Sequence, residues 1–292
     1  MFNIKSYQKA DSIQEAVRLL QQNPQARLLA GGTDVLVKLQ KGKGHFHHLI
    51  DIHGLDALNF IKLNDEGDLV IGSGTCFTIV EQSPLIRQHI PVLSLAISTI
   101  GGPQVRNMAT IGGNLCNGVP SADSAPPLIA LNAALTIEGV DGQRQVPLED
   151  FFRGPGMVTL EPHEVVTAIA VTRENYAGYH GHFFKYAMRD AMDIATIGCA
   201  AVCKVENNLL KDLRLAYNTA APVPIRCRRT EQKACNRQIS QKLLDDIAAR
   251  VSNDVKPRTS WRAAKDFRLQ IISTLAQRVV GQAILNAGGT IQ

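Results

Sequence analysis

The sequence predicts an α+β fold in two domains, the first made of two smaller α/β units. The chain has 292 residues, more than one hydrophobic core usually organises. Helical and strand patterns alternate as far as Val171, whereas strands precede helices after a polar, glycine-containing segment at 173–182. We therefore predict a first domain over 1–176, with units at about 1–54 and 55–176, and a smaller second domain over 177–292.

The first unit reads as a helix followed by a strand, a short helix and a second strand. Ser12 and Glu15 form a capping-box pattern, in which the two residues satisfy each other's free backbone donors. An apolar helical face follows, and Asn23-Pro24 ends the helix. The next elements are a strand over 27–30, a helix over 35–40 and a strand over 49–52. Gly31-Gly32 thus follows a strand, where ligands of α/β folds usually bind.

The second unit surrounds a long glycine-rich segment at 100–123. Asp141-Gly142 is a strong hairpin signal, and Pro126-Pro127 is tolerated in the first turn of a helix. The predicted elements are a strand over 69–71, helices over 85–100 and 126–130, hairpin strands over 134–138 and 143–147, a loop over 151–156 and a strand over 164–171.

The second domain begins with strands and ends with helices. Strands are predicted over 195–205 and 212–217, joined through Asn207-Asn208. Two helical stripes follow, and Gly288-Gly289 ends the second. The stripes are Leu243, Leu244, Ile247 and Val251, then Phe267, Ile271, Leu275 and Val279.

Composition and charge disfavour several classes of protein. The net charge is +5, and the only basic cluster is Arg226, Arg228 and Arg229, so a nucleic-acid surface is not expected. No apolar stretch reaches the length of a membrane span, and the first residues do not open a secretory signal. The six cysteines form no CxxC pair, so we expect a reducing, cytoplasmic environment.

Metal and hydrolytic sites are not predicted. His45, His47 and His48 have no acidic or cysteine partner nearby in the sequence. Cys199 and Cys203 share one face of a predicted strand and read as small buried hydrophobes. No Ser/His/Asp arrangement appears, so no catalytic residue is predicted.

Two glycine turns are the main indication of function. One is Gly112-Gly113, between Thr110 and Asn114, and the other is Gly31-Gly32. Glycine lets the backbone approach a ligand, and successive N–H groups in such turns bind phosphate oxygens. Neither turn matches the GxGxxG or GxxxxGK[ST] motif. Two such cradles predict one dinucleotide, held from both sides by its pyrophosphate.

Three blocks, in this order, resemble the FAD-binding subunit of the xanthine dehydrogenase family of molybdenum hydroxylases. They are LLAGGTDV at 28–35, GPQVRNMATIGGNLCNGVPSAD at 102–123 and FFKYAMRDAMDIATIGCAA at 183–201. The resemblance implies a PCMH-type FAD-binding domain that holds FAD non-covalently. It also implies a C-terminal α+β domain, with an antiparallel sheet and helices, like that of the CO dehydrogenase flavoprotein.

The resemblance also implies which residues bind FAD. Residues 28–35 would run along the pyrophosphate and the adenine side, and Thr110, Gly113 and Asn114 would contact phosphate oxygens. Asp123 would bind ribityl or ribose hydroxyls. The predicted set is Leu28, Leu29, Ala30, Gly31, Gly32, Thr33, Asp34, Val35, Ile100, Ala109, Thr110, Gly113, Asn114, Asp123, Val166 and Lys185.

The flavin end of the cofactor would meet the later residues of this set. Lys185 would place a cation near the ring, with Val166 as an apolar wall. Ile100 stands at a family position that can be phenylalanine in the xanthine-oxidising enzymes. The loop 188–193 would border the face that NAD+ approaches, with Arg189, Asp190 and Asp193 as candidates for gating this acceptor.

The implied function is electron transfer within a heterotrimer. A large molybdopterin subunit would oxidise a purine, and a small subunit with two [2Fe–2S] clusters would pass electrons through FAD to NAD+. The chain lacks the cysteine-rich insertion of some relatives and should hold no metal itself. Two alternatives remain open: a self-sufficient FAD-dependent oxidase or reductase with the same FAD-binding fold, and a non-catalytic nucleotide-binding assembly subunit.

Overall fold

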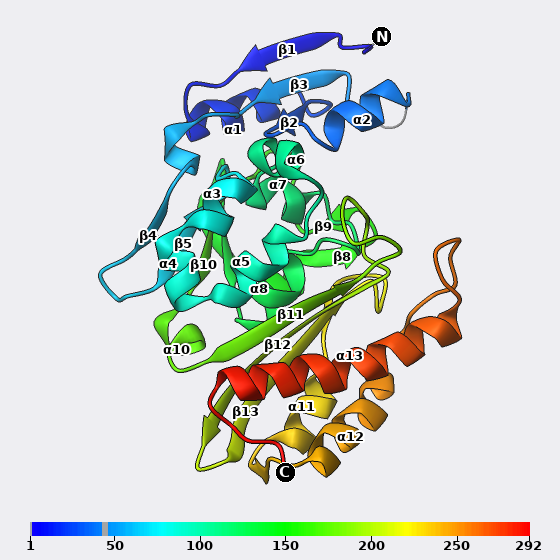
Figure 1. The fold of residues 1–292 in the computed structure, drawn as a ribbon. Helices are drawn as coiled ribbons and strands as arrows, with labels where there is room; N and C mark the ends of the chain where they lie inside the picture. The colour runs from blue at the N-terminus through cyan, green and yellow to red at the C-terminus, as the bar shows by residue number, and fades with distance from the viewer. Residues whose placement is uncertain (1, 43–45) are drawn as a thin grey trace.

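The computed structural model describes residues 2–42 and 46–292, which form three main β-sheets arranged one below another in Figure 1. The N-terminal sheet lies at one end, and the C-terminal sheet at the other, covered by the long helix α13 (Lys265–Asn286). Three clusters of buried apolar side chains fill the layers. The predicted α+β fold is confirmed, while the division at residues 176 and 177 stays a prediction.

The N-terminal sheet is small and parallel. Its order is β1 (Ser6–Lys9), β3 (His48–Asp51) and β2 (Arg27–Leu29), with α1 (Ile13–Gln22) and α2 (Val35–Gln40) between the strands in sequence. Sequence reasoning missed β1. Ser12 caps α1 by accepting the N–H of Glu15 at 3.1 Å. The Glu15 carboxylate accepts the N–H of Asp11, not that of Ser12, so the predicted reciprocal box is wrong in its second half.

The central sheet is antiparallel. Its order is β4 (Ile61–Leu63), β5 (Leu69–Gly72), β10 (Val165–Val171), β6 (Ala134–Gly139) and β7 (Gly142–Pro147). The predicted hairpin is confirmed, and Gly142 has a φ of +105° that favours glycine. The predicted loop over 151–156 instead contains β8 (Phe152–Gly154), which pairs with β9 (Met157–Val158).

Short helices lie before, between and after these strands in the sequence. They are η1 (Asp56–Leu58), α3 (Phe77–Gln82), α4 (Pro84–His89), α5 (Pro91–Ser98), α6 (Pro103–Met108), α7 (Ile111–Cys116), α8 (Ala125–Ala130), α9 (Leu148–Phe151) and α10 (Arg173–Tyr176). The single helix predicted over 85–100 is wrong, because Pro91 divides it. Proline lacks an N–H and disfavours the helical conformation in the preceding residue, and Ile90 has φ −138° and ψ 57°.

The C-terminal sheet separates two apolar layers. It contains β11 (His180–Tyr186), β12 (Ile197–Glu206), β13 (Leu209–Asn218), β14 (Ile225–Arg226) and β15 (Arg237–Gln238). Its helical side has α11 (Arg228–Ala234), α12 (Gln241–Arg250), η2 (Val251–Asn253) and α13. Along β12, Ala200 and Val202 belong to the central core, whereas Cys199 and Cys203 belong to the helical core. This alternation confirms that the two cysteines share a buried face.

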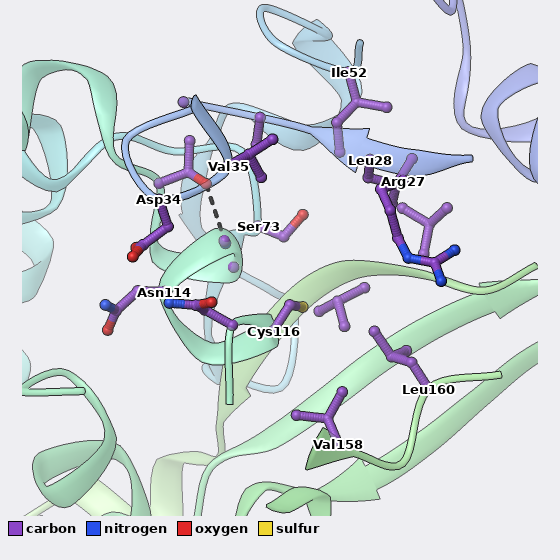
Figure 2. Close-up of a pocket in the computed structure, with 18 of the residues that line it drawn as sticks. Arg27, Leu28, Asp34, Val35, Ile52, Ser73, Asn114, Cys116, Val158 and Leu160 are labelled. Atoms are coloured by element: carbon purple, nitrogen blue, oxygen red, sulfur yellow. Dashed lines mark hydrogen bonds between the residues drawn. The ribbon is translucent and has the colours of Figure 1, made fainter. Parts of the chain in front are cut away.

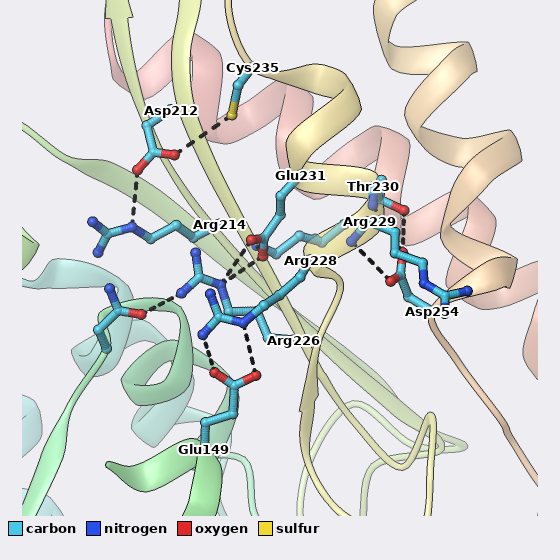
Figure 3. Close-up of polar contacts among 12 residues, drawn as sticks. Glu149, Asp212, Arg214, Arg226, Arg228, Arg229, Thr230, Glu231, Cys235 and Asp254 are labelled. Atoms are coloured by element: carbon cyan, nitrogen blue, oxygen red, sulfur yellow. Dashed lines mark hydrogen bonds and ion pairs between the residues drawn. The ribbon is translucent and has the colours of Figure 1, made fainter.

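Polar contacts also join the C-terminal layer to the central one (Figure 3). Arg228 pairs with Glu149 of α9 across the two layers. Arg226, whose side chain is 6% exposed, pairs with Glu231 at 2.8 Å within the C-terminal layer. Two members of the basic cluster seen in the sequence are thus matched with carboxylates. Among the helices of the described residues, none is long and apolar enough to cross a bilayer.

Candidate functional site

The two glycine turns meet at one cavity. A β-carbon built on Gly31 would stand 1.7 Å from the carbonyl oxygen of Met108, so the first turn lies directly against the backbone that leads into the second. The cavity beside them has a volume of about 510 Å³. In Figure 2, Leu28 and Ile52 lie on one side of it, and Val158 and Leu160 lie on the opposite side.

The first turn offers free backbone donors to this cavity. Within the part of the chain that the structure describes, the N–H groups of residues 30–35 have no hydrogen-bond acceptor. All six residues line the cavity. Gly32 has a φ of +71°, a backbone conformation that favours glycine. Consecutive unoccupied N–H groups of this kind suit the oxygens of a phosphate.

The second turn contributes side chains instead of N–H groups. The N–H of Gly112 donates to the Ser73 carbonyl at 2.9 Å, and that of Gly113 donates to the Thr110 hydroxyl at 3.1 Å. The N–H of Asn114 donates to the Thr110 carbonyl at 3.0 Å. The expected N–H cradle is therefore absent from this turn. The Thr110 hydroxyl hydrogen and the Asn114 amide nitrogen have no acceptor among the described residues, and both residues line the cavity.

One wall is held by an ion pair that sequence reasoning missed. Arg144 of β7 donates to both oxygens of Glu164 at 2.7 Å, and Glu164 also accepts the N–H of Glu161 at 2.8 Å. These hydrogen bonds, that of Arg144 foremost, hold the pKa of Glu164 below its usual range. Glu161 and Glu164 line the cavity. The two paired residues are 20 positions apart in the sequence, and nothing in the sequence pattern connects them.

Lys38 is a further residue of the cavity that sequence reasoning missed. It lies on α2, and its ammonium group donates to the Asn117 side-chain oxygen at 2.6 Å. This bond joins the N-terminal unit to the end of α7, and both residues line the cavity. Lys38 and Arg27 are the two cationic side chains of the described lining. A helix of six residues is too short for the periodicity of its sequence to show which side chains face a ligand.

Lys185 and Asp123 form a separate buried network. The Lys185 ammonium donates to Asp123 Oδ2 and to the Thr99 carbonyl, both at 2.8 Å. Asp123 Oδ1 accepts from the Asn218 amide at 2.7 Å. Burial raises the pKa of the Asp123 carboxyl, although Lys185 and Asn218 lower it. Both carboxylate oxygens are thus already hydrogen-bonded.

The structure therefore divides the predicted set in two. Lining the cavity are Leu28, Ala30, Gly31, Gly32, Thr33, Asp34, Val35, Ala109, Thr110, Gly113, Asn114 and Val166. Not lining it are Leu29, Ile100, Asp123 and Lys185. The Ser124 hydroxyl donates to the side chain of Asn114, which lines the cavity, at 2.7 Å. Ser124 follows Asp123 in the sequence, so the Lys185–Asp123 pair is one residue away from this contact. Met192, in the loop 188–193, lies 3.5 Å from the position a β-carbon would take on Gly102.

Two of the three histidines at 45, 47 and 48 lie within hydrogen-bond distance of protein groups. His47 Nδ1 lies 2.7 Å from the Asn3 carbonyl, and His48 Nδ1 lies 2.8 Å from the Ser6 hydroxyl. His45 lies outside the described residues. Over 2–42 and 46–292, no group of three or more His, Cys, Asp or Glu side chains could hold a metal ion.

Comparison with known proteins covers the whole chain. A family model described as the FAD binding domain in molybdopterin dehydrogenase matches residues 1–173, and the CO dehydrogenase flavoprotein C-terminal domain matches residues 182–283. The chain is 47% identical to the xanthine dehydrogenase FAD-binding subunit of Escherichia coli O157:H7, over 100% of both chains. It is 32% identical to the glyceraldehyde dehydrogenase medium chain of Sulfolobus acidocaldarius, over 94% of this chain and 96% of the relative.

The fold agrees with these matches. A solved carbon monoxide dehydrogenase chain from Hydrogenophaga pseudoflava superposes with a TM-score of 0.93 at 29% identity, covering 98% of this chain and 99% of that chain.

Proposed function

We propose a function for this chain from its family, since the chain belongs to the family of FAD-binding domains of molybdopterin dehydrogenases. The proposed function is that of the electron-transferring flavoprotein subunit of a xanthine dehydrogenase. The convergence of the two glycine turns on one cavity is the observation that carries this proposal. The volume of about 510 Å³ is typical of sites that bind cofactors.

The residues present fit the phosphate-bearing part of FAD. The unoccupied N–H groups of residues 30–35 would hold the pyrophosphate, since they need acceptors and lie on the cavity wall. Thr110 and Asn114 would donate from the other side, and Lys38 would supply positive charge. A side chain on Gly31 would collide with Met108, so this glycine lets the two halves of the site close.

The remaining predicted residues would serve the flavin end. Lys185 would hold a positive charge in a buried position, fixed by Asp123 and the Thr99 carbonyl. To bind a hydroxyl of the cofactor, Asp123 would have to share an oxygen already bonded to Lys185 or Asn218. Val166 is buried and lines the cavity, which suits an apolar wall. Bound FAD would supply the exchange between single electrons and a hydride.

Partners and acceptor follow as part of the same proposal. We infer a cytoplasmic complex with a large molybdopterin subunit and a small [2Fe–2S] subunit, a purine substrate and NAD+ as acceptor. Support for xanthine over glyceraldehyde comes from the higher identity to the xanthine dehydrogenase subunit, 47% against 32%. Arg189 and Asp193 lie 3.7 Å apart in the loop that would meet the acceptor.

Purification of the chain tests the proposal directly. Protein that retains FAD, shows the flavin absorption bands and loses them when NADH is added without oxygen would support it. Colourless protein that cannot be reconstituted with FAD would contradict it and favour a nucleotide-binding assembly subunit. Turnover of an organic substrate by the chain alone would favour a self-sufficient oxidase or reductase.

A further inference from the structure

A second cleft is lined by three arginines. It has a volume of about 230 Å³ and lies between the end of the glycine-rich segment, at Pro120 and Ser121, and the beginning of α13. Arg258, Arg262 and Arg268 line it together. No acidic side chain is part of its described lining, so the charge of the cleft is of one sign.

The most buried arginine of this cleft, Arg268, has no counter-ion among the residues that the structure describes. Arg268 is only 5% exposed, and none of the ion pairs among the described residues includes it, Arg258 or Arg262. Its guanidinium donates to the Thr196 carbonyl and, at 2.9 Å, to the Ser260 hydroxyl. Both acceptors are neutral. A buried charge without a partner is costly, so this arrangement calls for an anion.

Unsatisfied polar atoms gather at the same place. Arg262 Nε, Arg268 Nε and Thr196 Oγ1 are buried without a hydrogen-bond partner among the described residues. Burial and the charges of Arg258 and Arg262 lower the pKa of Arg268, as expected for clustered cations. The cleft also adjoins the positive end of the α13 dipole. Asp266 in that first turn is exposed and forms no ion pair with these arginines in the described structure.

We propose that this arginine cleft binds an oxyanion, a carboxylate or phosphate group, which Arg268 holds at its floor and Arg258 and Arg262 hold at its mouth. Guanidinium groups are suited to such groups because their donors match two oxygens at once. The anion could be free in solution or be a carboxylate of a partner polypeptide. Trp261, 78% exposed and stacked on Arg262, lines the cleft and would be covered in the second case.

Trp261 makes the cleft measurable, because it is the only tryptophan of the chain. Its fluorescence would be followed in the purified, FAD-loaded chain during titration with inorganic phosphate and then with acetate, against sodium chloride at equal ionic strength. We expect a saturable change with phosphate or acetate that chloride does not produce. Arg262→Met should weaken the affinity by about tenfold or more, since one charge-assisted contact is lost. Arg278→Met, an exposed arginine on the same helix, is the matched control and should change nothing.

Co-purification distinguishes the two sources of the anion, and this arm rests on the proposed function. If a partner's carboxylate occupies the cleft, Arg258→Met and Arg262→Met should reduce recovery of partner subunits, while Arg278→Met should not. If the anion is free, recovery should be unchanged and the phosphate or acetate titration should saturate.

Absence of both a saturable response and an effect on recovery would overturn the proposal. Flavin content, measured in the same samples, separates this failure from failure of the proposed function. Arg258 and Arg262 do not line the FAD cavity, so they should leave flavin content at the wild-type value.

Discussion

Gly31 touches the backbone carbonyl of Met108, although 77 positions separate them in the sequence (108 − 31). Through this contact the N-terminal unit closes against the central sheet, and the cavity forms between them (Figures 1 and 2). The turn with unoccupied N–H groups thereby faces the turn with unoccupied side-chain donors. In the function proposed above, the dinucleotide would be bound from both sides, and this approach would make that possible.

Gly31→Ala should therefore prevent FAD retention. The new methyl group cannot stand 1.7 Å from the Met108 oxygen, so the two units must separate. We expect the free energy of unfolding to fall by about 1–3 kcal/mol, as for other overpacked sites. Urea unfolding and the flavin-to-protein ratio measure the two effects. Gly154→Ala is the control, because the nearest atom there is 3.7 Å away. Wild-type flavin content in Gly31→Ala would contradict this account of the site.

Lys38→Met should weaken FAD binding without removing the cavity. The variant keeps the length of the side chain but loses the charge and the bond to Asn117. A hydrogen bond to a charged group contributes about 1.5–3 kcal/mol, so the Kd should rise about tenfold or more. Calorimetric titration of the FAD-free chain measures this. Lys41→Met, an exposed lysine just beyond α2, should leave the Kd unchanged. Equal Kd values for the two variants would exclude Lys38 from the site.

Lys185→Met should leave Asp123 buried without its cation. We expect a loss of about 3–5 kcal/mol in the free energy of unfolding at neutral pH. Because Lys185 lowers the pKa of Asp123, its removal raises that pKa further. The folded chain then binds a proton that the unfolded chain has released, so stability falls as the pH rises from the unfolded to the folded pKa.

The difference in the free energy of unfolding between Lys185→Met and the wild type should accordingly shrink as the pH is lowered. Urea unfolding at several pH values measures this difference. The double variant Lys185→Met, Asp123→Asn has no buried carboxylate and should lose this pH dependence. A loss that is the same at every pH would show that Asp123 is not the cause.

Arg144→Met should loosen the cavity wall, with the opposite pH dependence. Arg144 lowers the pKa of Glu164 in the folded chain. The pair therefore adds to the free energy of unfolding above the pKa that Glu164 has in the unfolded chain, and this contribution is lost as the pH falls through its pKa in the folded chain. Arg144 is 40% exposed, and we expect the pair to contribute about 1 kcal/mol at neutral pH. Urea unfolding should show this difference vanishing in acid. Arg153→Met, exposed and without an ion pair among the described residues, is the control. A difference that persists in acid would mean that lost packing, not charge, is responsible.

Local features of the fold were predictable because they depend on neighbours in the sequence. The bounds of α2, the cap at Ser12 and the turn at Asn207-Asn208, where both residues have positive φ, follow from short-range preferences. The helix divided at Pro91 was also a local feature, and the apolar run around it concealed the break. The strand β1 has mostly exposed residues and therefore no apolar pattern to mark it.

The sequence by itself determined which backbone segments can approach a phosphate, because the absence of side chains at Gly31, Gly32 and Gly113 is a property of the residues themselves. Only the tertiary structure decided which donors remain free, since the Ser73 carbonyl and the Thr110 hydroxyl occupy the N–H groups of the second turn. It also decided which charges meet, pairing Arg144 with Glu164 and giving Arg268 neutral acceptors and no carboxylate among the described residues. Such pairings depend on how elements far apart in the chain pack together, and no local pattern specifies them.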